Sequence, residues 1–487
     1  MLDPDTMTPR QKSAALLALV VALVLEIVDL TIVNTALPAI TADFGKADFG
    51  AAAQVTTWVV AGYSLAFALL LLTGGRMGDS FGYRRMFLLG VAGFTLASVL
   101  CGVAHSAEQL IAARLLQGAT GAIMGPQFMA LMQVLFAPLE RIAKLAMFGV
   151  IGGLAAIIGP IIGGLLIGAN LFGLGWRLIF LINLPVGLLA IGLGYAFLPG
   201  TRSSRPAGFD VVGTGLFGLA LGALLWPLMH GPGDHGELAI YALLAAVGPL
   251  GWLGWRHVAR RVRDGRAALF DPSLFEIASF RLGLAVAISF AAANAGFLLC
   301  FAFALQSERG QTPLATGLLH MPFGLGAMIG IAVVSRRLLP KLGRWVLVGG
   351  SVIMVLFASL VLLGIGELGL SWLQLTPLVV GAGLGMGMIS GGVTPITVAR
   401  VDRDHAGAAS GLLKTAQQMG SALGVALVGG CYFAGAGRYF AGAGRGGHPG
   451  STVALLALIP LLVLSGVFAL RLPRAIFAHA RKGPHEA

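Results

Sequence analysis

Apolar stretches, each about long enough to cross a bilayer, recur from Ser13 to Leu472. An α-helix needs roughly 20 predominantly apolar residues to span a hydrocarbon core of about 30 Å. Hydrophobic residues make up 57% of the chain and charged residues only 11%, whereas a soluble domain carries about 25% charge. Transmembrane β-strands would show segments of about 10 residues with alternating polarity, which the sequence lacks. The sequence therefore predicts an all-α polytopic membrane protein.

We predict fourteen transmembrane helices with short connections. Their ranges are 13–37, 54–74, 86–104, 108–132, 142–168, 176–198, 210–229, 238–255, 280–304, 314–335, 345–366, 371–398, 408–434 and 451–471. The segments after the second and tenth helices resemble each other, because Gly82 and Gly343 both stand among basic residues. Matching them predicts an N-terminal six-helix bundle at 13–198, two inserted helices with a cytoplasmic linker at 199–279, and a C-terminal six-helix bundle at 280–472.

The net charge of +12 reflects topology and not nucleic-acid binding. If the N-terminus is cytoplasmic, most of the 32 Lys and Arg residues fall on loops of that side, including the cluster from Arg256 to Arg266. The opposite side holds only a few, such as Lys46 and Arg177. Cytoplasmic loops carry such an excess of basic residues. Both termini are therefore expected in the cytoplasm, with no nucleic-acid partner.

Two carboxylates and one guanidinium lie at membrane depth. Glu26 and Asp29 are one turn apart on the first helix and share a face, and Arg114 lies about two turns inside the fourth. An ionised group at that depth costs several kcal/mol, so such residues face a wet cavity and mark function. We expect the two acids to exchange protons near neutral pH and Arg114 to respond to their protonation. The alternative is a static structural role for all three residues.

The fifth helix contains Gly159-Pro160 followed by Gly163 and Gly164. Proline removes one intrahelical hydrogen bond and permits a kink, and the glycines offer a smooth face for close packing. We interpret this motif as a shaped hinge that seals the outer side. Ordinary packing against a neighbouring helix is the alternative.

Gating at the cytoplasmic side is expected from the loop after the second helix, which contains Asp79, Gly82, Arg84 and Arg85. Charge pairs made by this loop would hold the gate, and the alternative is a topological anchor. Polar and aromatic residues of several spans are candidates for the substrate cavity, although buried amides and rings also simply join helices. They are Asn34, Trp58, Tyr63, Asn294 and Gln417.

Six motifs occur in order along the chain. They are residues 29–38 in the first helix, Gly75–Arg85 after the second, Arg114–Gly118 in the fourth, Gly159–Gly164 in the fifth, Trp176–Pro185 in the sixth and Phe209–Gly213 at the seventh. Together they resemble the signatures of the fourteen-helix drug:proton antiporters of the major facilitator superfamily. The resemblance covers nearly the whole chain. It implies two six-helix bundles with two inserted helices, the residues 159–164 being similar to the motif typical of exporters.

The expected function is proton-coupled efflux of lipophilic or cationic drugs by alternating access, in the bacterial inner (plasma) membrane. The proton motive force would be the driver, with no cofactor, and the partners would be a small-molecule substrate, protons and the lipid bilayer, the protein acting as a monomer. Export of one specific metabolite or siderophore is the alternative.

Other classes of protein fit the sequence poorly. The sequence has no HExxH, GxSxG or GxxxxGK[ST] motif, so neither an enzyme nor an ATP-driven pump is indicated. The three cysteines lie in different spans without a CxxC pair, which argues against a metal site or disulfide framework. A scaffold or receptor would leave Glu26, Asp29 and Arg114 without a role.

Overall fold

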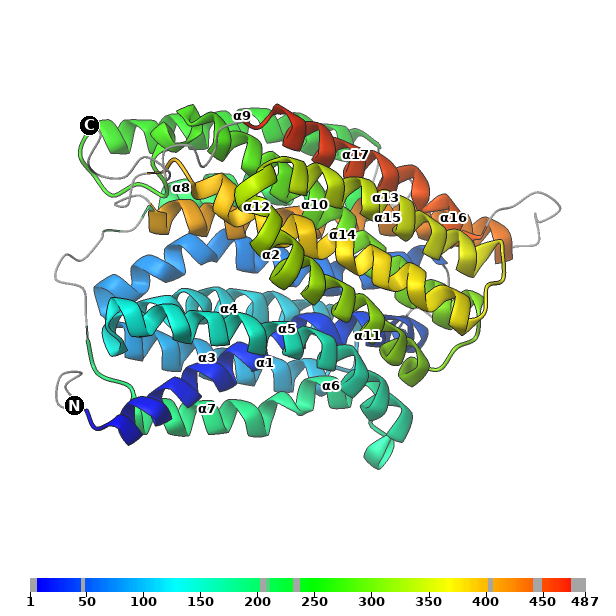
Figure 1. Ribbon diagram of the computed structural model, residues 1–487, viewed down its shortest axis with the longest axis horizontal. Coiled ribbons are helices and arrows are strands. Elements are labelled where there is room, and N and C mark those ends of the chain that lie inside the picture. Colours follow the sequence, from blue (N-terminus) through cyan, green and yellow to red (C-terminus); the bar gives the residue numbers. More distant parts are fainter. Residues whose placement is uncertain are drawn as a thin grey trace. The chain divides into compact units, whose positions relative to one another are not determined.

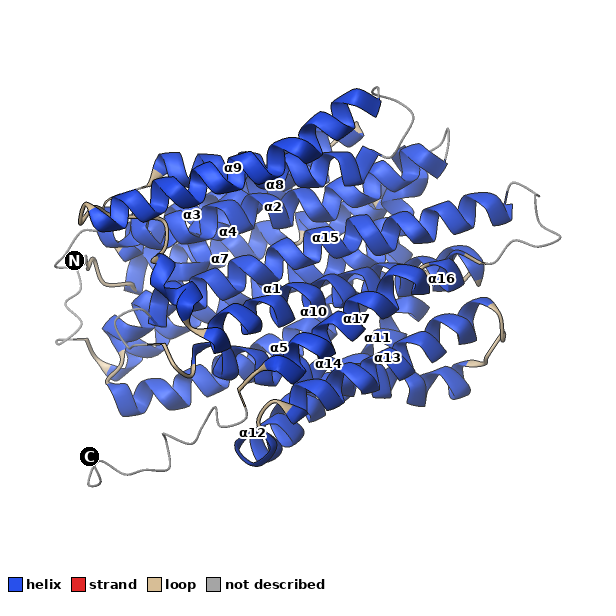
Figure 2. Ribbon diagram, turned by 90° about the horizontal axis from the view of Figure 1, so that it is seen from above, coloured by secondary structure: helices blue, strands red, loops and turns tan. Residues whose placement is uncertain are grey.

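The computed structural model describes residues 7–44, 49–201, 208, 210–230, 237–401, 406–440 and 449–473. Helices form nearly all of these residues and none of them is in a strand, which confirms the all-α prediction (Figure 2). A helix covers most of each predicted span, and twelve of the described helices are long and apolar enough to cross a membrane. The helices α4 and α9 are not among the twelve. Figure 1 shows the order of the helices along the chain by colour.

Contacts divide the chain into two compact units, which are Met1–Phe270 with Thr312–Gly317, and Asp271–Gln311 with Leu318–Ala487. The helices of the first unit are α1 (Pro9–Phe44), α2 (Phe49–Phe81), α3 (Tyr83–Gly102), α4 (Ala107–Leu135), α5 (Pro138–Ala169), α6 (Leu178–Leu181), α7 (Asn183–Phe197), α8 (Val211–His230) and α9 (Glu237–Arg263). Two 3₁₀ turns, Leu171–Gly173 and Gly175–Arg177, precede α6.

Short-range signals set several helix ends in the first unit. The side chain of Ser106 caps α4 by accepting a hydrogen bond from the backbone N–H of Gln109, as a serine at the N-cap commonly does. Pro138 begins α5, where its missing N–H costs nothing, and Asn170 ends that helix in a left-handed conformation. Gly82 separates α2 from α3 with a φ of 99°, a conformation that favours glycine.

The first unit packs α4 against both α2 and α3, and α1 against α5 and α7. Gly118 allows the close approach of α4 to α2, because a Cβ at this position would overlap the carbonyl oxygen of Tyr63. Two threonine hydroxyls, Thr73 Oγ1 and Thr214 Oγ1, lie 3.1 Å apart and join α2 to α8. The polar side chains of α1 and α4 are consequently held inside the bundle.

The second unit contains α10 (Ala278–Phe303), α11 from Leu318 onward (α11 spans Pro313–Ile329), α12 (Arg336–Leu342), α13 (Trp345–Gly366), α14 (Trp372–Val398), α15 (Ala406–Phe440), α16 (Gly450–Val453) and α17 (Leu455–Arg471). A 3₁₀ turn, Pro272–Glu276, precedes α10. π-Helical segments follow α10 at Ala304–Glu308 and α11 at Gly330–Ser335. In this unit α10 packs against α15 and α17, and α13 against α14 and α17.

The two units repeat one pattern of helix pairing. The pairs of α1 with α5 and α7 correspond to those of α10 with α15 and α17, and the pairs of α3 with α4 and α7 to those of α13 with α14 and α17. The turns that the sequence aligned also correspond. Arg84, after Gly82, donates to the Tyr195 carbonyl near the end of α7, and Arg344, after Gly343, donates to the carbonyls of Leu470 and Leu472 at the end of α17. Each arginine thus places a positive charge at the negative C-terminal end of the helix that it binds, α7 or α17.

Asp210 joins the beginning of α8 to α9 and to the segment that follows it. Its Oδ1 accepts from the backbone N–H of Gly213 and lies 2.9 Å from His257 Nε2, and its Oδ2 accepts from the backbone N–H of Leu269. Burial raises the pKa of Asp210, but these hydrogen bonds outweigh it and leave the pKa below its ordinary value. Asp210 comes from the last of the six sequence motifs, whose Phe209 lies outside the described residues.

We predict that Asp210→Ala lowers the thermal unfolding midpoint of the purified protein. Loss of the charged acceptor costs about 1.5–3 kcal/mol. Because the folded-state pKa is depressed, this stabilisation is present above the unfolded value of about 3.9 and is lost as the pH falls through the folded value. The difference between the variant and the parent should therefore shrink in acid. Asp264→Asn, which changes an exposed acid after α9, is the control and should leave the midpoint unchanged. An equal midpoint for Asp210→Ala and the parent at pH 7 would contradict this role.

Candidate functional site

Buried charge is concentrated between α1 and α4. Among the described residues, the buried Asp, Glu, Lys and Arg side chains are Glu26, Asp29, Arg114 and Asp210. Three of these four are the residues that the sequence places at membrane depth. Asp29 is completely buried, and Glu26 and Arg114 are each 2% exposed. The predicted proton-coupling residues therefore lie inside the first unit and not on its surface.

Asp29 and Arg114 form a direct ion pair. Arg114 Nη1 lies 2.8 Å from Asp29 Oδ2 and also donates to Gln117 Oε1 at 2.7 Å. Its Nε donates to the carbonyl oxygen of Val59 at 3.0 Å. The guanidinium lies 4.4 Å from the centre of the Tyr63 ring, a cation–π contact. The anionic and carbonyl partners that a deeply buried arginine requires are thus both present.

Three uncharged side chains complete this cluster. Gln117 Nε2 and Asn183 Nδ2 donate to Asp29 Oδ1 at 2.7 and 2.9 Å. Both amides also donate to Ser98 Oγ, whose hydroxyl donates to the carbonyl oxygen of Phe180. The carboxylate is consequently held by α4 and α7, with Ser98 of α3 behind the two amides.

The sequence analysis did not name these three residues as site residues, although it contained signals for two of them. Gln117 lies three residues after Arg114, which places both on one helix face. Asn183 lies in the Trp176–Pro185 motif. Only the packing of α7 against α1 and α3 shows that Asn183 reaches the carboxylate of Asp29 and that Ser98 binds the amide of Asn183.

Glu26 lies one turn before Asp29 on α1, near α4. A Cβ added at Gly125 would lie 3.6 Å from Glu26 Oε2, so the carboxylate faces a helix position without a side chain. The two acids therefore occupy one buried face of α1, and Arg114 binds Asp29 directly. A buried pair of this kind is sensitive to change, because loss of one partner leaves an uncompensated charge that costs about 3–5 kcal/mol.

The candidate cavity residues occupy different environments. Tyr63 is completely buried and its ring packs over Arg114, whereas Asn34 and Trp58 are half-buried. Asn294 on α10 and Gln417 on α15 are also half-buried and belong to the second unit. Tyr63 thus contacts the proposed proton site itself.

The motif of α5 packs tightly against α1. A Cβ at Gly159 would overlap Thr31 Oγ1, and one at Gly163 would lie 2.7 Å from Ile32 Cγ1. Gly164 and Pro160 contact the segment Thr312–Gly317, which belongs to the same unit. The close-packed face of α5 therefore contacts α1 at Thr31, two residues after Asp29.

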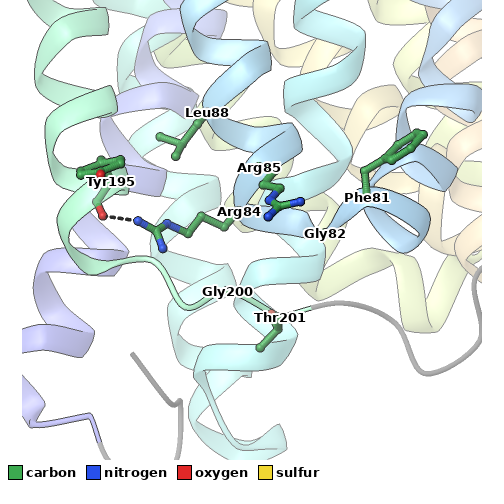
Figure 3. Close-up of a pocket in the computed structure, with 8 residues that line it drawn as sticks. All are labelled: Phe81, Gly82, Arg84, Arg85, Leu88, Tyr195, Gly200 and Thr201. Carbon is green, nitrogen blue, oxygen red and sulfur yellow. Dashed lines mark hydrogen bonds between the residues drawn. The ribbon is translucent and has the colours of Figure 1, made fainter. Parts of the chain in front are cut away.

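The turn between α2 and α3 borders a surface pocket of about 560 Å³ (Figure 3). Phe81, Gly82, Arg84 and Arg85 line it from the turn, and Tyr195 lines it from α7. Arg84 lies over the Tyr195 ring and bonds its carbonyl oxygen. Asp79, on α2, accepts a hydrogen bond from the Tyr83 hydroxyl at 2.9 Å. The turn is thus held to α7 by Arg84.

No cluster of three or more His, Cys, Asp or Glu side chains that could hold a metal ion occurs in the described part of the chain. The arrangement between α1 and α4 is suited to a different chemistry. It can bind a proton on a buried carboxylate and alter an ion pair that spans two helices.

Known proteins resemble this chain over most of its length. Residues 19–425 match the Major Facilitator Superfamily. The chain is 40% identical to the probable actinorhodin transporter of Streptomyces coelicolor, covering 86% of this chain and 72% of that protein. It is 34% identical to the puromycin resistance protein of Streptomyces alboniger, covering 93% and 90%. It is 30% identical to the multidrug efflux pump LfrA of Mycolicibacterium smegmatis, covering 87% and 81%.

Solved structures share the fold at low sequence identity. A bacterial homologue of the human lysosomal transporter Spinster, in an inward-facing, unoccupied conformation, matches with a TM-score of 0.63 and 17% identity, covering 97% of this chain and 98% of that one. The human organic anion transporter MFSD10 matches with a TM-score of 0.59 and 15% identity, covering 95% and 100%. The chain therefore belongs to the Major Facilitator Superfamily and is a multi-pass inner-membrane transporter, not an enzyme, with drug and antibiotic exporters among its relatives.

Proposed function

We propose that this protein exports lipophilic or cationic small molecules in exchange for protons, with Asp29 as the proton carrier. The supporting observation is the completely buried carboxylate of Asp29 paired with Arg114 at 2.8 Å. An ionisable pair at membrane depth is costly, and such residues commonly form proton relays in transporters. A purely structural clamp would not require groups that change charge.

The transport cycle follows from competition between a proton and Arg114 for the carboxylate of Asp29. A proton that enters from the outer side neutralises the carboxylate and removes the main attraction for Arg114. Because Asp29 is on α1 and Arg114 on α4, this change alters the attraction between two helices of the first unit. Proton release to the cytoplasm restores the pair. Each charge that crosses the membrane contributes about 2.3 kcal/mol per 100 mV, and this gradient drives substrate outward.

The substrate class is inferred from the relatives. Proteins named for actinorhodin, tetracenomycin C and puromycin are among them, as are pumps named for multiple drugs. We therefore propose planar or lipophilic antibiotics and dyes as substrates. Export of a single metabolite is the second candidate, favoured by the 40% identity to a transporter named for one compound. A siderophore would fit the same scheme.

We also propose a fourteen-span topology with both termini in the cytoplasm. On this proposal, 13–198 and 280–472 form the two six-helix bundles and 199–279 supplies the inserted pair. The repeated pairing of helices within each unit supports the two bundles. The remaining expectations are a monomer and no cofactor.

Two segments are proposed as gates that move during alternating access. The close-packed face of Gly159, Pro160, Gly163 and Gly164 would seal the outer side. The turn of Asp79, Gly82, Arg84 and Arg85 would serve the cytoplasmic side. Both lie on helices that contact the proton-carrying bundle: α5 packs on α1, and α2 and α3 pack on α4.

We predict that Asp29→Asn abolishes proton-coupled efflux, because the neutral side chain imitates the protonated acid and fixes the cycle there. Everted membrane vesicles that accumulate ethidium against its gradient provide the measurement, with the proton gradient followed in parallel. Energy-independent exchange of dye should survive. Glu26→Gln should be milder, or should narrow the range of accepted cations.

Glu140→Gln changes an exposed acid at the beginning of α5 and serves as the matched control, with efflux expected at the parental rate. Accumulation by Asp29→Asn at the parental rate would place the proton site elsewhere and would overturn the assignment.

The packing of α5 gives a second prediction. Gly159→Leu and Pro160→Leu should reduce efflux severely while leaving the protein in the membrane, because a bulky side chain blocks one of the access states. Gly159→Ala should show a smaller loss because its Cβ overlaps Thr31 Oγ1, and Thr31→Ala should partly restore it. Gly149→Ala, on the same helix and with open space around the added Cβ, is the control. Normal efflux by both leucine variants would reduce the motif to ordinary packing.

The topology is checked with reporters fused to the chain. A reporter active only in the cytoplasm should work after Ala487, and one active only outside should work near His235, both sites lying outside the described residues. If the reporter that is active only in the cytoplasm works near His235, the inserted pair of spans is contradicted.

A further inference from the structure

The hydrogen-bond directions around Asp29 are fixed by groups that can only donate or only accept. The guanidinium of Arg114 has no acceptor, so Gln117 must turn its Oε1 toward Arg114 and its Nε2 toward Asp29. The carbonyl of Phe180 has no donor, so the Ser98 hydroxyl donates to it and Ser98 Oγ accepts. Asn183 Nδ2 therefore donates one hydrogen bond to Ser98 Oγ and one to Asp29 Oδ1.

The two carboxylate oxygens of Asp29 consequently differ in their hydrogen-bond donors. Oδ1 accepts two amide N–H groups, from Gln117 at 2.7 Å and Asn183 at 2.9 Å. Oδ2 accepts from Arg114 Nη1 at 2.8 Å. A carboxylate oxygen has two lone pairs in its plane, so two amide donors occupy both lone pairs of Oδ1. A proton bound at Oδ1 would face an N–H hydrogen.

Resting on the function proposed above, we propose that Asn183 and Gln117 are positioning residues that reserve Oδ1 and direct the transported proton to Oδ2, where it competes with Arg114. The step moves one proton and breaks one ion pair. The proton forms an O–H bond at Oδ2, the N–H donor of Arg114 turns away, and Oδ1 becomes the carbonyl oxygen of the neutral acid. Release of the proton reverses each change.

Arg114 retains partners when Oδ2 is protonated. Its Nε bonds the Val59 carbonyl oxygen at 3.0 Å, its Nη1 bonds Gln117 Oε1 at 2.7 Å, and its guanidinium lies over the Tyr63 ring. Gln117 therefore holds Arg114 with one end and Asp29 with the other. This arrangement keeps the cation next to Oδ2, ready to displace the proton.

The other titratable groups near Asp29 come from three helices. Glu26 lies on α1, Tyr63 on α2 and Cys101 on α3; Tyr63 and Cys101 interact electrostatically with Asp29 and Arg114. From α7, the side chain that bonds Asp29 is the uncharged amide of Asn183. Replacing Asn183 by an apolar residue therefore changes the hydrogen bonding of Asp29 without changing the number of charges around it.

The test is infrared spectroscopy of the purified, full-length protein during a pH titration. The carbonyl band of protonated Asp29 is the band that Asp29→Asn removes. Hydrogen bonds to a carbonyl oxygen lower its stretching frequency, so Asn183→Leu should move this band to higher wavenumber. Gln117→Leu removes the other Oδ1 donor and should shift the band in the same direction, which provides a second variant if Asn183→Leu does not fold. An unmoved band in the folded variants, or a parent without such a band, would overturn the proposal.

Efflux measured against pH gives the second readout. Loss of a donor to the ionised carboxylate makes protonation easier, so Asn183→Leu should move the profile to higher pH by about one unit. Thr95→Val is the matched control, since Thr95 packs on Gly187 at the same interface of α3 and α7 and bonds the Val91 carbonyl. It should change neither the band nor the profile. A structural role alone would lower the amount of folded Asn183→Leu protein and leave its profile unmoved.

The outcomes separate this inference from the proposed function. If Asp29→Asn stops coupled efflux but the Asn183→Leu band stays in place, the function stands and the positioning role falls. If the band moves while Asp29→Asn still concentrates ethidium, the geometry stands and Asp29 is not the coupling site.

Discussion

The buried ion pair of Asp29 and Arg114 is the interaction around which the first unit is organised. A carboxylate and a guanidinium without water need partners for every donor and acceptor, because an unpaired buried charge is far costlier than a lost apolar contact. Those partners are the Val59 carbonyl on α2, Gln117 on α4 and Asn183 on α7, and Ser98 on α3 accepts hydrogen bonds from both amides. Satisfying one pair of charges therefore fixes how α2, α4 and α7 approach α1.

Small residues make this arrangement possible. Gly118 lets α4 lie against the backbone of α2, next to the turn that carries Arg114, and Gly159 lets α5 lie against α1 beside Thr31. Within a membrane there is little hydrophobic drive between helices, so close packing and interhelical hydrogen bonds supply the association. The same contacts that stabilise the bundle thus surround the ion pair of Asp29 and Arg114. On the function proposed above, protonation of Asp29 would favour a different packing of these helices.

The duplicated architecture shows which features belong to the fold and which to the site. Both units pair their helices in the same pattern, and in each an arginine after a glycine of positive φ binds backbone carbonyls at the end of one helix, α7 or α17. Asp29 and Arg114, however, are the buried ion pair of the first unit, and within the described residues of the second unit no Asp, Glu, Lys or Arg side chain is buried. The two arginines that bind helix ends are therefore part of the shared scaffold, whereas the buried ion pair of Asp29 and Arg114 belongs to the first unit alone among the described residues.

The sequence by itself determined the all-helical class, the position of most spans and the candidates Glu26, Asp29 and Arg114, because the bilayer imposes a length and a polarity that are visible residue by residue. It also indicated the close-packed face of Gly159 and Gly163. Only the tertiary structure decided that Arg114 binds Asp29, that Tyr63 packs on Arg114, and that Asn183 reaches the carboxylate of Asp29. Those contacts join residues that lie 51 to 154 positions apart in the sequence, and hydropathy and spacing within one helix carry no information about which helices become neighbours.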